Sequence, residues 1–378
     1  MSGIYFHIPF CKQACHYCNF HFSTSLMYKN EMLTAMQKEI SLVAFSALDN
    51  NKIDTIYFGG GTPSLLSAAE IKTFLQAAKE VYSVDKNAEI TLEANPDDIN
   101  EIKLNEWKAA GINRLSIGIQ SFKQKDLEWM NRAHNTEQAM QCFAMIKSAG
   151  FTNYSVDLIY GTPGLDDDEW KKNIDTVTDM EAPHISCYAL TVEPETALQK
   201  MILQKKKEDI DPEKQARHFL ILMSRLYAAG YEHYEISNFA LPTYRSRHNS
   251  SYWQGKPYIG IGPSAHSYFG NIRRWNISNN ALYIKSLQNN LVPFEEEKLS
   301  LTQQLNEYVM TSLRTMEGLN LNFVKENFGV QKTILLKNQS AKFQENGKLV
   351  SINDNLVLTK EGKLFADGIA ADLFFGTE

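Results

Sequence analysis

The sequence of 378 residues predicts an α/β protein with a partial (β/α)6 barrel, three quarters closed, followed by a small winged-helix-like domain. Up to about residue 190, short apolar runs rich in β-branched and aromatic residues alternate with longer segments of helical period. This alternation is typical of βα units and a parallel sheet. Six such units are too few for a closed barrel of eight strands. The alternation stops near residue 300, where the second domain is expected to begin.

Six segments predict the strands of the barrel by their length and composition. They are Tyr5–Ile8, Thr55–Phe58, Glu89–Glu93, Arg114–Ile119, Ser155–Tyr160 and Ile185–Leu190. Helical periodicity predicts helices between them, over 26–46, 68–82, 100–110, 136–149 and 168–180. Gly111 and Gly150 stand where a C′ glycine would end two of these helices. Ligands of such a sheet bind at the carboxyl ends of its strands.

The remaining chain predicts an amphipathic helix over 212–229 and an edge strand with a turn in Tyr234–Ala240. Near the C-terminus we expect a hairpin and a final helix. The expected domains are 1–200 for the core, 201–298 for an extension with a motif-bearing loop, and 299–378 for the winged-helix-like part. Residues 301–378 contain eight Lys or Arg and nine Asp or Glu. This segment therefore lacks the excess of positive charge that is typical of nucleic-acid-binding domains. A lid role suits this domain better.

Composition excludes several classes of protein. The net charge of −6 argues against broad nucleic-acid binding. No run of about eighteen apolar residues predicts a membrane span. The first residues lack the basic and apolar regions of a secretory signal, so we expect a cytoplasmic protein. Cys142 and Cys187 are expected to be small buried side chains.

The other three cysteines, Cys11, Cys15 and Cys18, lie within eight residues and predict a metal site rather than disulfides. Iron–sulfur clusters are held by thiolates at short, uneven spacings. A four-iron cluster held by three cysteines would leave one iron open to an exchangeable ligand. The alternative is a zinc site that recruits one of the nearby histidines, although no second ligand pair of regular spacing follows.

The Cys-x3-Cys-x2-Cys pattern, with Tyr17 before its last cysteine, resembles the radical S-adenosylmethionine (SAM) enzymes. The resemblance implies a [4Fe-4S] cluster on the three cysteines and SAM chelated to the fourth iron. Gly59-Gly60-Gly61-Thr62-Pro63, after the second strand, is similar to the segment that holds the amino group of SAM in that superfamily. By itself this segment would equally suit a tight turn between a strand and a helix.

Glu93, Gln120 and Asp157 belong to three successive predicted strands or directly follow them. Because successive strands converge in such a fold, we expect the three side chains to share a pocket. Each could instead cap a turn.

Over residues 3–275, these motifs resemble the oxygen-independent coproporphyrinogen oxidases and their relatives, the HemW heme chaperones. The resemblance implies two sets of SAM-lining residues. Those for the SAM on the cluster are Tyr5, Tyr17, Gly60, Gly61, Thr62 and Glu93. Those matching a second SAM of the oxidase are Gln120, Arg132, Asp157 and Ala189. For Arg132 a solvated charge is the alternative interpretation.

A second motif, His248-Asn249-Ser250-Ser251-Tyr252-Trp253, follows two arginines. A histidine among aromatics and cations could ligate heme iron, stack on the macrocycle and pair with propionates. A polar loop with a hydrogen-bonded histidine is the alternative. The motif matches the HNxxYW pattern of HemW proteins, which implies heme binding with His248 as a ligand. Gly260 to Ser267 resembles a further segment of that family, where His266 is a secondary candidate.

Phe20 favours the chaperone, since the oxidases carry a fourth cysteine there and HemW proteins carry Phe. The first cysteine is already residue 11, whereas the oxidases have a longer N-terminal extension. The resemblance therefore implies a protein that binds heme and passes it to an acceptor protein, with the cluster and SAM retained. A homodimer and a peripheral membrane contact are compatible with it. The alternatives are a coproporphyrinogen III oxidase, which would make the chain an enzyme of porphyrin biosynthesis, and a structural zinc protein.

Overall fold

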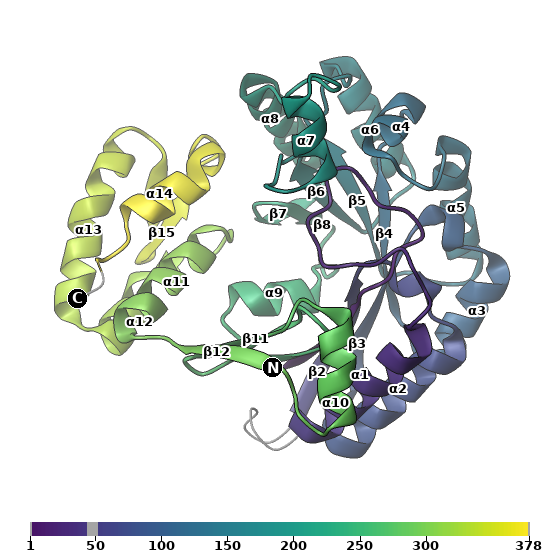
Figure 1. The fold of residues 1–378 in the computed structure, drawn as a ribbon. Coiled ribbons are helices and arrows are strands. Elements are labelled where there is room, and N and C mark those ends of the chain that lie inside the picture. The colour runs from purple at the N-terminus through teal and green to yellow at the C-terminus, as the bar shows by residue number, and fades with distance from the viewer. Residues whose placement is uncertain (1, 44–51, 377–378) are drawn as a thin grey trace.

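The computed structural model describes residues 2–43 and 52–376 (Figure 1). Its main body is a curved sheet of twelve strands in the order β12-β11-β10-β9-β1-β2-β3-β4-β5-β6-β8-β7. Strands β1 to β6 pair in parallel, each with the next. Their bounds are Gly3–Ile8, Lys52–Gly60, Ser83–Ala94, Arg114–Gln120, Tyr154–Tyr160 and His184–Ala189. All six predicted strands are confirmed, and so is the partial barrel.

Helices cover the outer face of this sheet, and their apolar sides pack on the outward-facing residues of the strands (Figure 1). They are α1 (Lys29–Val43), α2 (Ala68–Val81), α3 (Glu101–Ala110), α5 (Thr136–Ser148), α6 (Asp167–Asp179) and α8 (Pro212–Ala228). The short helices α4 (Gln124–Met130) and α7 (Ala197–Leu203) instead pack in a separate apolar cluster with Ile159 and Leu190. Capping boxes begin α2 and α5, and Gly111 ends α3 at a positive φ of 113°. The part of the first expected helix beyond residue 43 lies outside the described residues.

The sheet continues beyond the six predicted strands on both sides. On one edge lie β8 (Asn238–Ala240) and β7 (Glu232–Glu235), where the sequence predicted an edge strand. On the other edge β9 (Tyr258–Ile261) pairs in parallel with β1. It is followed by β10 (His266–Phe269), β11 (Ile272–Asn276), α10 (Asn280–Gln288) and β12 (Phe294–Lys298). Residues 201–298 thus share the sheet and the hydrophobic core of residues 1–200.

The segment that was expected to be a motif-bearing loop is a helix, α9 (Arg247–Trp253). That expectation was wrong because two acceptors satisfy the first N–H groups of the helix. The Ser246 hydroxyl accepts from the Asn249 amide, and the Glu89 carboxylate accepts from the amides of Arg247 and His248. A carboxylate at a helix N-terminus also interacts favourably with the helix dipole.

The C-terminal part has its own hydrophobic core. It consists of α11 (Leu301–Leu313), β13 (Leu319–Asn320), α12 (Leu321–Phe328), α13 (Val330–Glu345), β14 (Leu349–Ile352), β15 (Asn355–Leu358) and α14 (Ala366–Asp372). Strands β14 and β15 form the predicted hairpin, and β13 joins them in a small antiparallel sheet. The combination of helices and a hairpin is winged-helix-like, as the sequence predicted.

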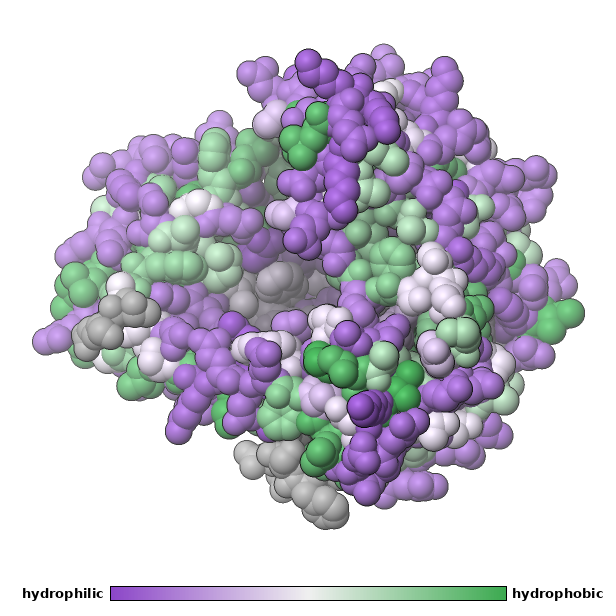
Figure 2. Space-filling view, in the orientation of Figure 1, coloured by the Kyte–Doolittle hydropathy of each residue, from purple (hydrophilic) through white to green (hydrophobic). Residues whose placement is uncertain are grey.

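Two backbone hydrogen bonds join the C-terminal part to edge strand β7. The Ile236 amide donates to the Arg314 carbonyl, and the Met316 amide donates to the Tyr234 carbonyl, both at 3.0 Å. Between the two parts the molecular surface is hollowed (Figure 2). Within the described residues, no helix combines the length and the apolar character that crossing a membrane requires.

Candidate functional site

The cysteine loop follows β1 and lies across the carboxyl ends of the parallel strands. Backbone hydrogen bonds fix it to three separate segments. The Cys11 amide donates to the Ser23 carbonyl at 3.0 Å, the His16 amide to the Met130 carbonyl at 3.1 Å, and the Leu198 amide to the His16 carbonyl at 2.7 Å. The loop is therefore held by tertiary contacts, and its cysteines lie where the fold predicts a ligand.

The thiols of Cys11, Cys15 and Cys18 are the candidate metal ligands of this loop. Among the described residues, no three His, Cys, Asp or Glu side chains converge closely enough to surround a single metal ion. A four-iron cube takes one cysteine per iron, so its ligands stand farther apart than those of zinc. Burial raises the pKa of the Cys11 thiol, and it raises that of Cys18 to about 11. Metal binding must therefore displace protons.

The glycine-rich turn packs directly against the cysteine loop. The Gly61 amide donates to the Ile8 carbonyl at 2.8 Å, and the Thr62 amide donates to the Phe10 carbonyl at 2.6 Å. A Cβ on Gly61 would lie 2.5 Å from the Phe10 carbonyl oxygen, which is too close for any other residue. Gly60 has a φ of 105°. The glycines thus allow the turn and the cysteine loop to approach each other.

Glu93, at the carboxyl end of β3, accepts a hydrogen bond from the Tyr57 hydroxyl at 2.8 Å. Burial raises the pKa of Glu93 to about 8, and the nearby Asp157 carboxyl on β5 adds to this rise. Burial also raises the pKa of Asp157 to about 6, although hydroxyls of Ser186 and Ser116 oppose it. Two nearby carboxyls with raised pKa values on the same face of the sheet are a candidate ligand site.

Gln120 and Arg132 each carry a buried polar atom without a protein partner, namely Gln120 Oε1 and Arg132 Nε. Gln120 also has a positive φ of 67°, a strained conformation for a non-glycine residue at a strand end. Arg132 donates to Cys15 Sγ at 3.3 Å and to Asn95 Oδ1 at 2.7 Å. Unpaired buried atoms beside the cysteine loop suit a polar ligand such as SAM.

The structure places most of the predicted SAM-lining residues at the carboxyl end of the barrel strands, with Tyr5 and Asp157 within their strands. Glu93, Gln120 and Ala189 stand at or next to the last residue of their strands, and Thr62 follows β2. Tyr17 packs against Leu127, Met130 and Leu198 beside Arg132. Tyr5 points to the inner side of β1, where its ring lies 6.0 Å from that of Tyr57. Asp157 stands in the middle of β5. The alternation of polar residues along β2 could have revealed Tyr57, which the sequence analysis missed.

His248 lies at the opposite end of the barrel, next to Gly3 at the start of β1. Its side chain is 1% exposed, and its ring stacks on Tyr57 at 4.9 Å. Nδ1 is hydrogen bonded to Thr55 Oγ1 and Nε2 to Tyr252 Oη, both at 2.8 Å. Burial lowers the pKa of His248 to about 3, so the imidazole is neutral. Neither ring nitrogen is free for iron in this conformation.

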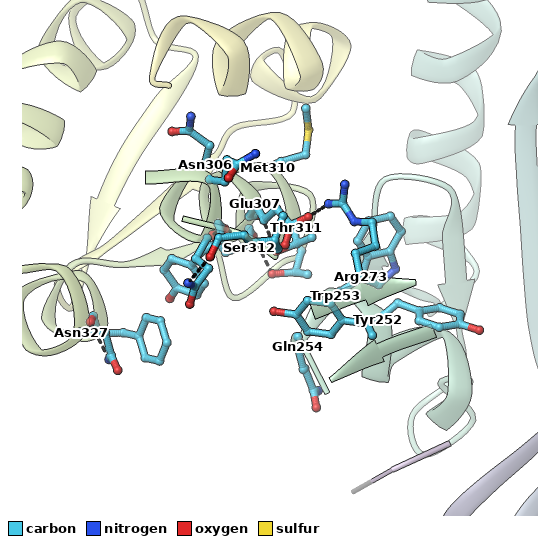
Figure 3. A pocket seen from close by; sticks show the side chains of 18 of the residues that line it. Tyr252, Trp253, Gln254, Arg273, Asn306, Glu307, Met310, Thr311, Ser312 and Asn327 are labelled. Carbon is cyan, nitrogen blue, oxygen red and sulfur yellow. Dashed lines mark hydrogen bonds and ion pairs between the residues drawn. The ribbon is translucent and has the colours of Figure 1, made fainter. Parts of the chain in front are cut away.

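A cavity of about 1230 Å³ lies between α9 and the C-terminal part (Figure 3). Tyr252, Trp253 and Arg273 line its core wall, and Tyr308, Met310 and Phe323 belong to the opposite wall. The dashed line between Arg273 and Glu307 in Figure 3 is an ion pair across the cavity. No local sequence pattern predicts this cavity, because its walls come from segments far apart in the chain.

The parallel sheet with three cysteines in the loop after β1 defines a protein of the radical SAM class. Residues 5–177 match the model of the radical SAM superfamily, and residues 299–365 match that of the HemN C-terminal domain. More narrowly, the chain belongs to the HemW family. It is 33% identical over 374 residues to the heme chaperone HemW of Bacillus subtilis, with 98% of each chain covered.

Other relatives agree with this assignment, and a solved structure matches the fold. HemW of Mycobacterium tuberculosis is 33% identical over 98% of this chain and 94% of its own length. HemW of Escherichia coli is 33% identical over 70% of this chain and 69% of its own. The fold matches the coproporphyrinogen III oxidase HemN of E. coli with a TM-score of 0.85 at 21% identity, covering 99% of this chain and 90% of that one. This last match concerns the fold alone.

Proposed function

We propose that this protein is a heme chaperone, which binds heme and passes it to an acceptor protein. It would hold a [4Fe-4S] cluster on Cys11, Cys15 and Cys18, with an exchangeable SAM. One observation carries the proposal, namely the 33% identity to curated HemW chaperones over nearly the whole of both chains. Free thiols and an oxygen-sensitive cluster agree with a cytoplasmic location.

The residues around the cysteine loop support the cofactor part of the proposal. When bound, the cluster and SAM supply one-electron chemistry at the sulfonium of SAM. SAM would contact the backbone of Gly60, Gly61 and Thr62 closely. Its polar groups would form hydrogen bonds with the side chains of Glu93, Gln120 and Asp157. Arg132 donates to the sulfur of Cys15, and such a hydrogen bond adjusts the properties of a cluster ligand. Tyr5, Tyr17 and Ala189 would complete the wall.

The role of His248 as a heme ligand stays a prediction. Ligation of iron by this residue would break its hydrogen bond to Thr55 or to Tyr252, and it would bring a ring that is 1% exposed to the surface. The proposal that the protein binds heme therefore does not depend on His248.

An oxidase that decarboxylates coproporphyrinogen III is the second candidate, favoured by the match of residues 299–365 to the model of the HemN C-terminal domain. Phe20 supports the chaperone instead, because the oxidases carry a further cysteine at that position. The structural zinc protein receives no support from the side chains of the described residues, which do not converge on a single ion.

Anaerobic reconstitution, followed by hemin titration and a porphyrinogen turnover assay in parallel, tests the proposal. A chaperone binds hemin and yields no protoporphyrinogen with SAM and reductant. Turnover of coproporphyrinogen would contradict the proposal and select the oxidase. Transfer of bound heme to an apo-acceptor, followed by absorption spectroscopy, tests the last step.

A further inference from the structure

The nine histidines of this chain all lie in the described residues, and they differ in what their rings contact. Six of them, His7, His16, His21, His134, His218 and His233, have at least one ring nitrogen engaged by the protein. His184 and His248 have both nitrogens engaged and are buried. The ninth, His266, is the one exposed histidine. Its one ring contact is with Trp275, at 6.3 Å between centroids.

The strand pairing places His266 on a face with aromatic and cationic neighbours. Residues directly opposite each other in an antiparallel pair share a face of the sheet. His266 is opposite Trp275, and Tyr268, two residues farther along β10, is opposite both Arg273 and Tyr258. Because side chains alternate along a strand, His266 and Tyr268 also share that face. The face therefore combines a free imidazole, three aromatic rings and a guanidinium.

This face continues into the cavity between the two parts of the molecule. Tyr258, Tyr268 and Arg273 all line that cavity, and His266 lies one step farther along the same face. Partial burial of the ring and the neighbouring Arg273 lower the pKa of His266, which favours the neutral ring that a metal ion requires. Across the cavity, Arg273 pairs with Glu307, while its contact with Glu297 is long at 3.8 Å (Figure 3).

We propose that His266, rather than His248, ligates the iron of bound heme, and that Arg273 binds a heme carboxylate in place of Glu307. The inference rests on the proposed function, since it assigns the ligand of the same heme. A neutral ring nitrogen donates its lone pair to iron, so ligation requires no proton transfer. The aromatic rings of this face contact the macrocycle, and the guanidinium exchanges one carboxylate for another.

The partly exposed position of Arg273 makes this exchange easy. Its side chain is 39% exposed and that of Glu307 is 27% exposed, so water screens their attraction. A heme carboxylate that replaces Glu307 would remove one ion pair between the core and the C-terminal part. Heme loading would then weaken the contact of the lid with the core, which suits a protein that must release its cargo.

Hemin titration of the full-length reconstituted protein tests the iron ligand. The readout is the Fe–N(His) stretch of the reduced complex in resonance Raman spectra, together with the hemin affinity. His266→Ala should lose this band and bind hemin more weakly by roughly tenfold or more. His233→Ala, at a partly exposed histidine of β7 that does not line the cavity, is the control and should keep the band. Because His266 is exposed, the ligand-free His266→Ala protein should keep the melting temperature of the wild type.

The carboxylate contact is tested with hemin and its dimethyl ester. Arg273→Gln should weaken binding of hemin and leave binding of the ester unchanged, whereas Glu307→Gln should tighten binding of hemin by removing its competitor. Arg225→Gln, which removes an ion pair with Asp175 away from the cavity, is the control.

Three outcomes would overturn the assignment. If the band persists in His266→Ala and disappears in His248→Ala, the proposed function stands and His266 is not the ligand. If Arg273→Gln weakens hemin and ester alike, the carboxylate contact is wrong. If the wild-type protein binds no hemin, the proposed function fails and this assignment fails with it.

Discussion

At the scale of single residues, the surroundings of a side chain decide which chemistry it can perform. His248 and His266 carry the same imidazole ring. Both ring nitrogens of His248 are hydrogen bonded, to Thr55 and to Tyr252, whereas His266 is exposed. Glu93 is likewise an ordinary carboxyl that burial and the nearby Asp157 hold in its neutral form. Contacts distant in sequence therefore determine which of several similar residues is available to a ligand.

His248→Ala should destabilise the ligand-free protein by about 2–4 kcal/mol. The substitution removes a buried ring and leaves the hydroxyls of Thr55 and Tyr252 without their partner. Urea unfolding followed by circular dichroism measures the change. A loss of less than about 0.5 kcal/mol, as expected for an exposed site, would show that His248 does not support the fold.

Glu93→Gln should stabilise the ligand-free protein in a way that depends on pH. The folded state raises the pKa of Glu93 from 4.5 to about 8, so the carboxyl's contribution to stability is complete below about pH 4.5 and is lost as the pH rises through 8. Glutamine stays neutral throughout. The variant's advantage should grow from near zero at pH 4.5 to on the order of 4 kcal/mol at pH 8.

Chemical unfolding at several pH values gives this difference. Glu106→Gln, at an exposed position in α3, is the control. A constant difference between Glu93→Gln and the wild type across this range would contradict the raised pKa.

At the scale of elements, the site depends on close contacts between a turn and a loop. Backbone hydrogen bonds join the glycine-rich turn after β2 to the cysteine loop after β1. The turn has no room for a Cβ at Gly61. In α9, the Glu89 carboxylate and the Ser246 hydroxyl turn a polar segment into a helix. Each element is thus shaped by a partner from elsewhere in the chain.

Gly61→Ala should separate the turn from the cysteine loop, because its Cβ would lie 2.5 Å from the Phe10 carbonyl oxygen and 2.9 Å from that of Ile8. We expect a loss of about 1–3 kcal/mol in stability and less iron and sulfide after reconstitution. Iron and acid-labile sulfide analysis measures the second effect.

Gly368→Ala is the matched control for this substitution. A Cβ there meets nothing within 4 Å, and the residue lies inside helix α14, so alanine should be neutral or stabilising. Equal cluster content in both variants would contradict the role of Gly61.

At the scale of the whole molecule, the C-terminal part covers the exposed edge of β7. It does so through the two backbone hydrogen bonds at Ile236 and Met316 and through the ion pair between Arg245 and Glu317 at 2.9 Å. An exposed sheet edge invites pairing with other chains, and this contact protects it. The same contact closes the cavity in which we place the heme.

Met316→Pro removes the amide that donates to the Tyr234 carbonyl. We expect faster hydrogen exchange at the Ile236 amide, with unchanged exchange in β1 to β6, because the loss is local to the contact. Mass spectrometry after deuterium labelling measures it. Met316→Ala keeps the amide and should behave like the wild type, and equal protection in both variants would show that this bond does not hold the lid.

The sequence by itself determined the six parallel strands, the cysteine loop and the glycine-rich turn, because periodicity and spacing are local and can be read directly from the chain. The positions of Glu93 and Gln120 at strand ends could also be predicted, whereas Asp157 lies within β5 and comes near Glu93 only in the folded chain. The parallel pairing of β9 with β1 and the two-walled cavity were decided by tertiary structure alone. Tertiary structure also decided that the ring of His248 is hydrogen bonded, because its partner Thr55 lies 193 positions away in the chain. A motif names a side chain, but only the folded chain determines whether its hydrogen-bonding atoms are already occupied.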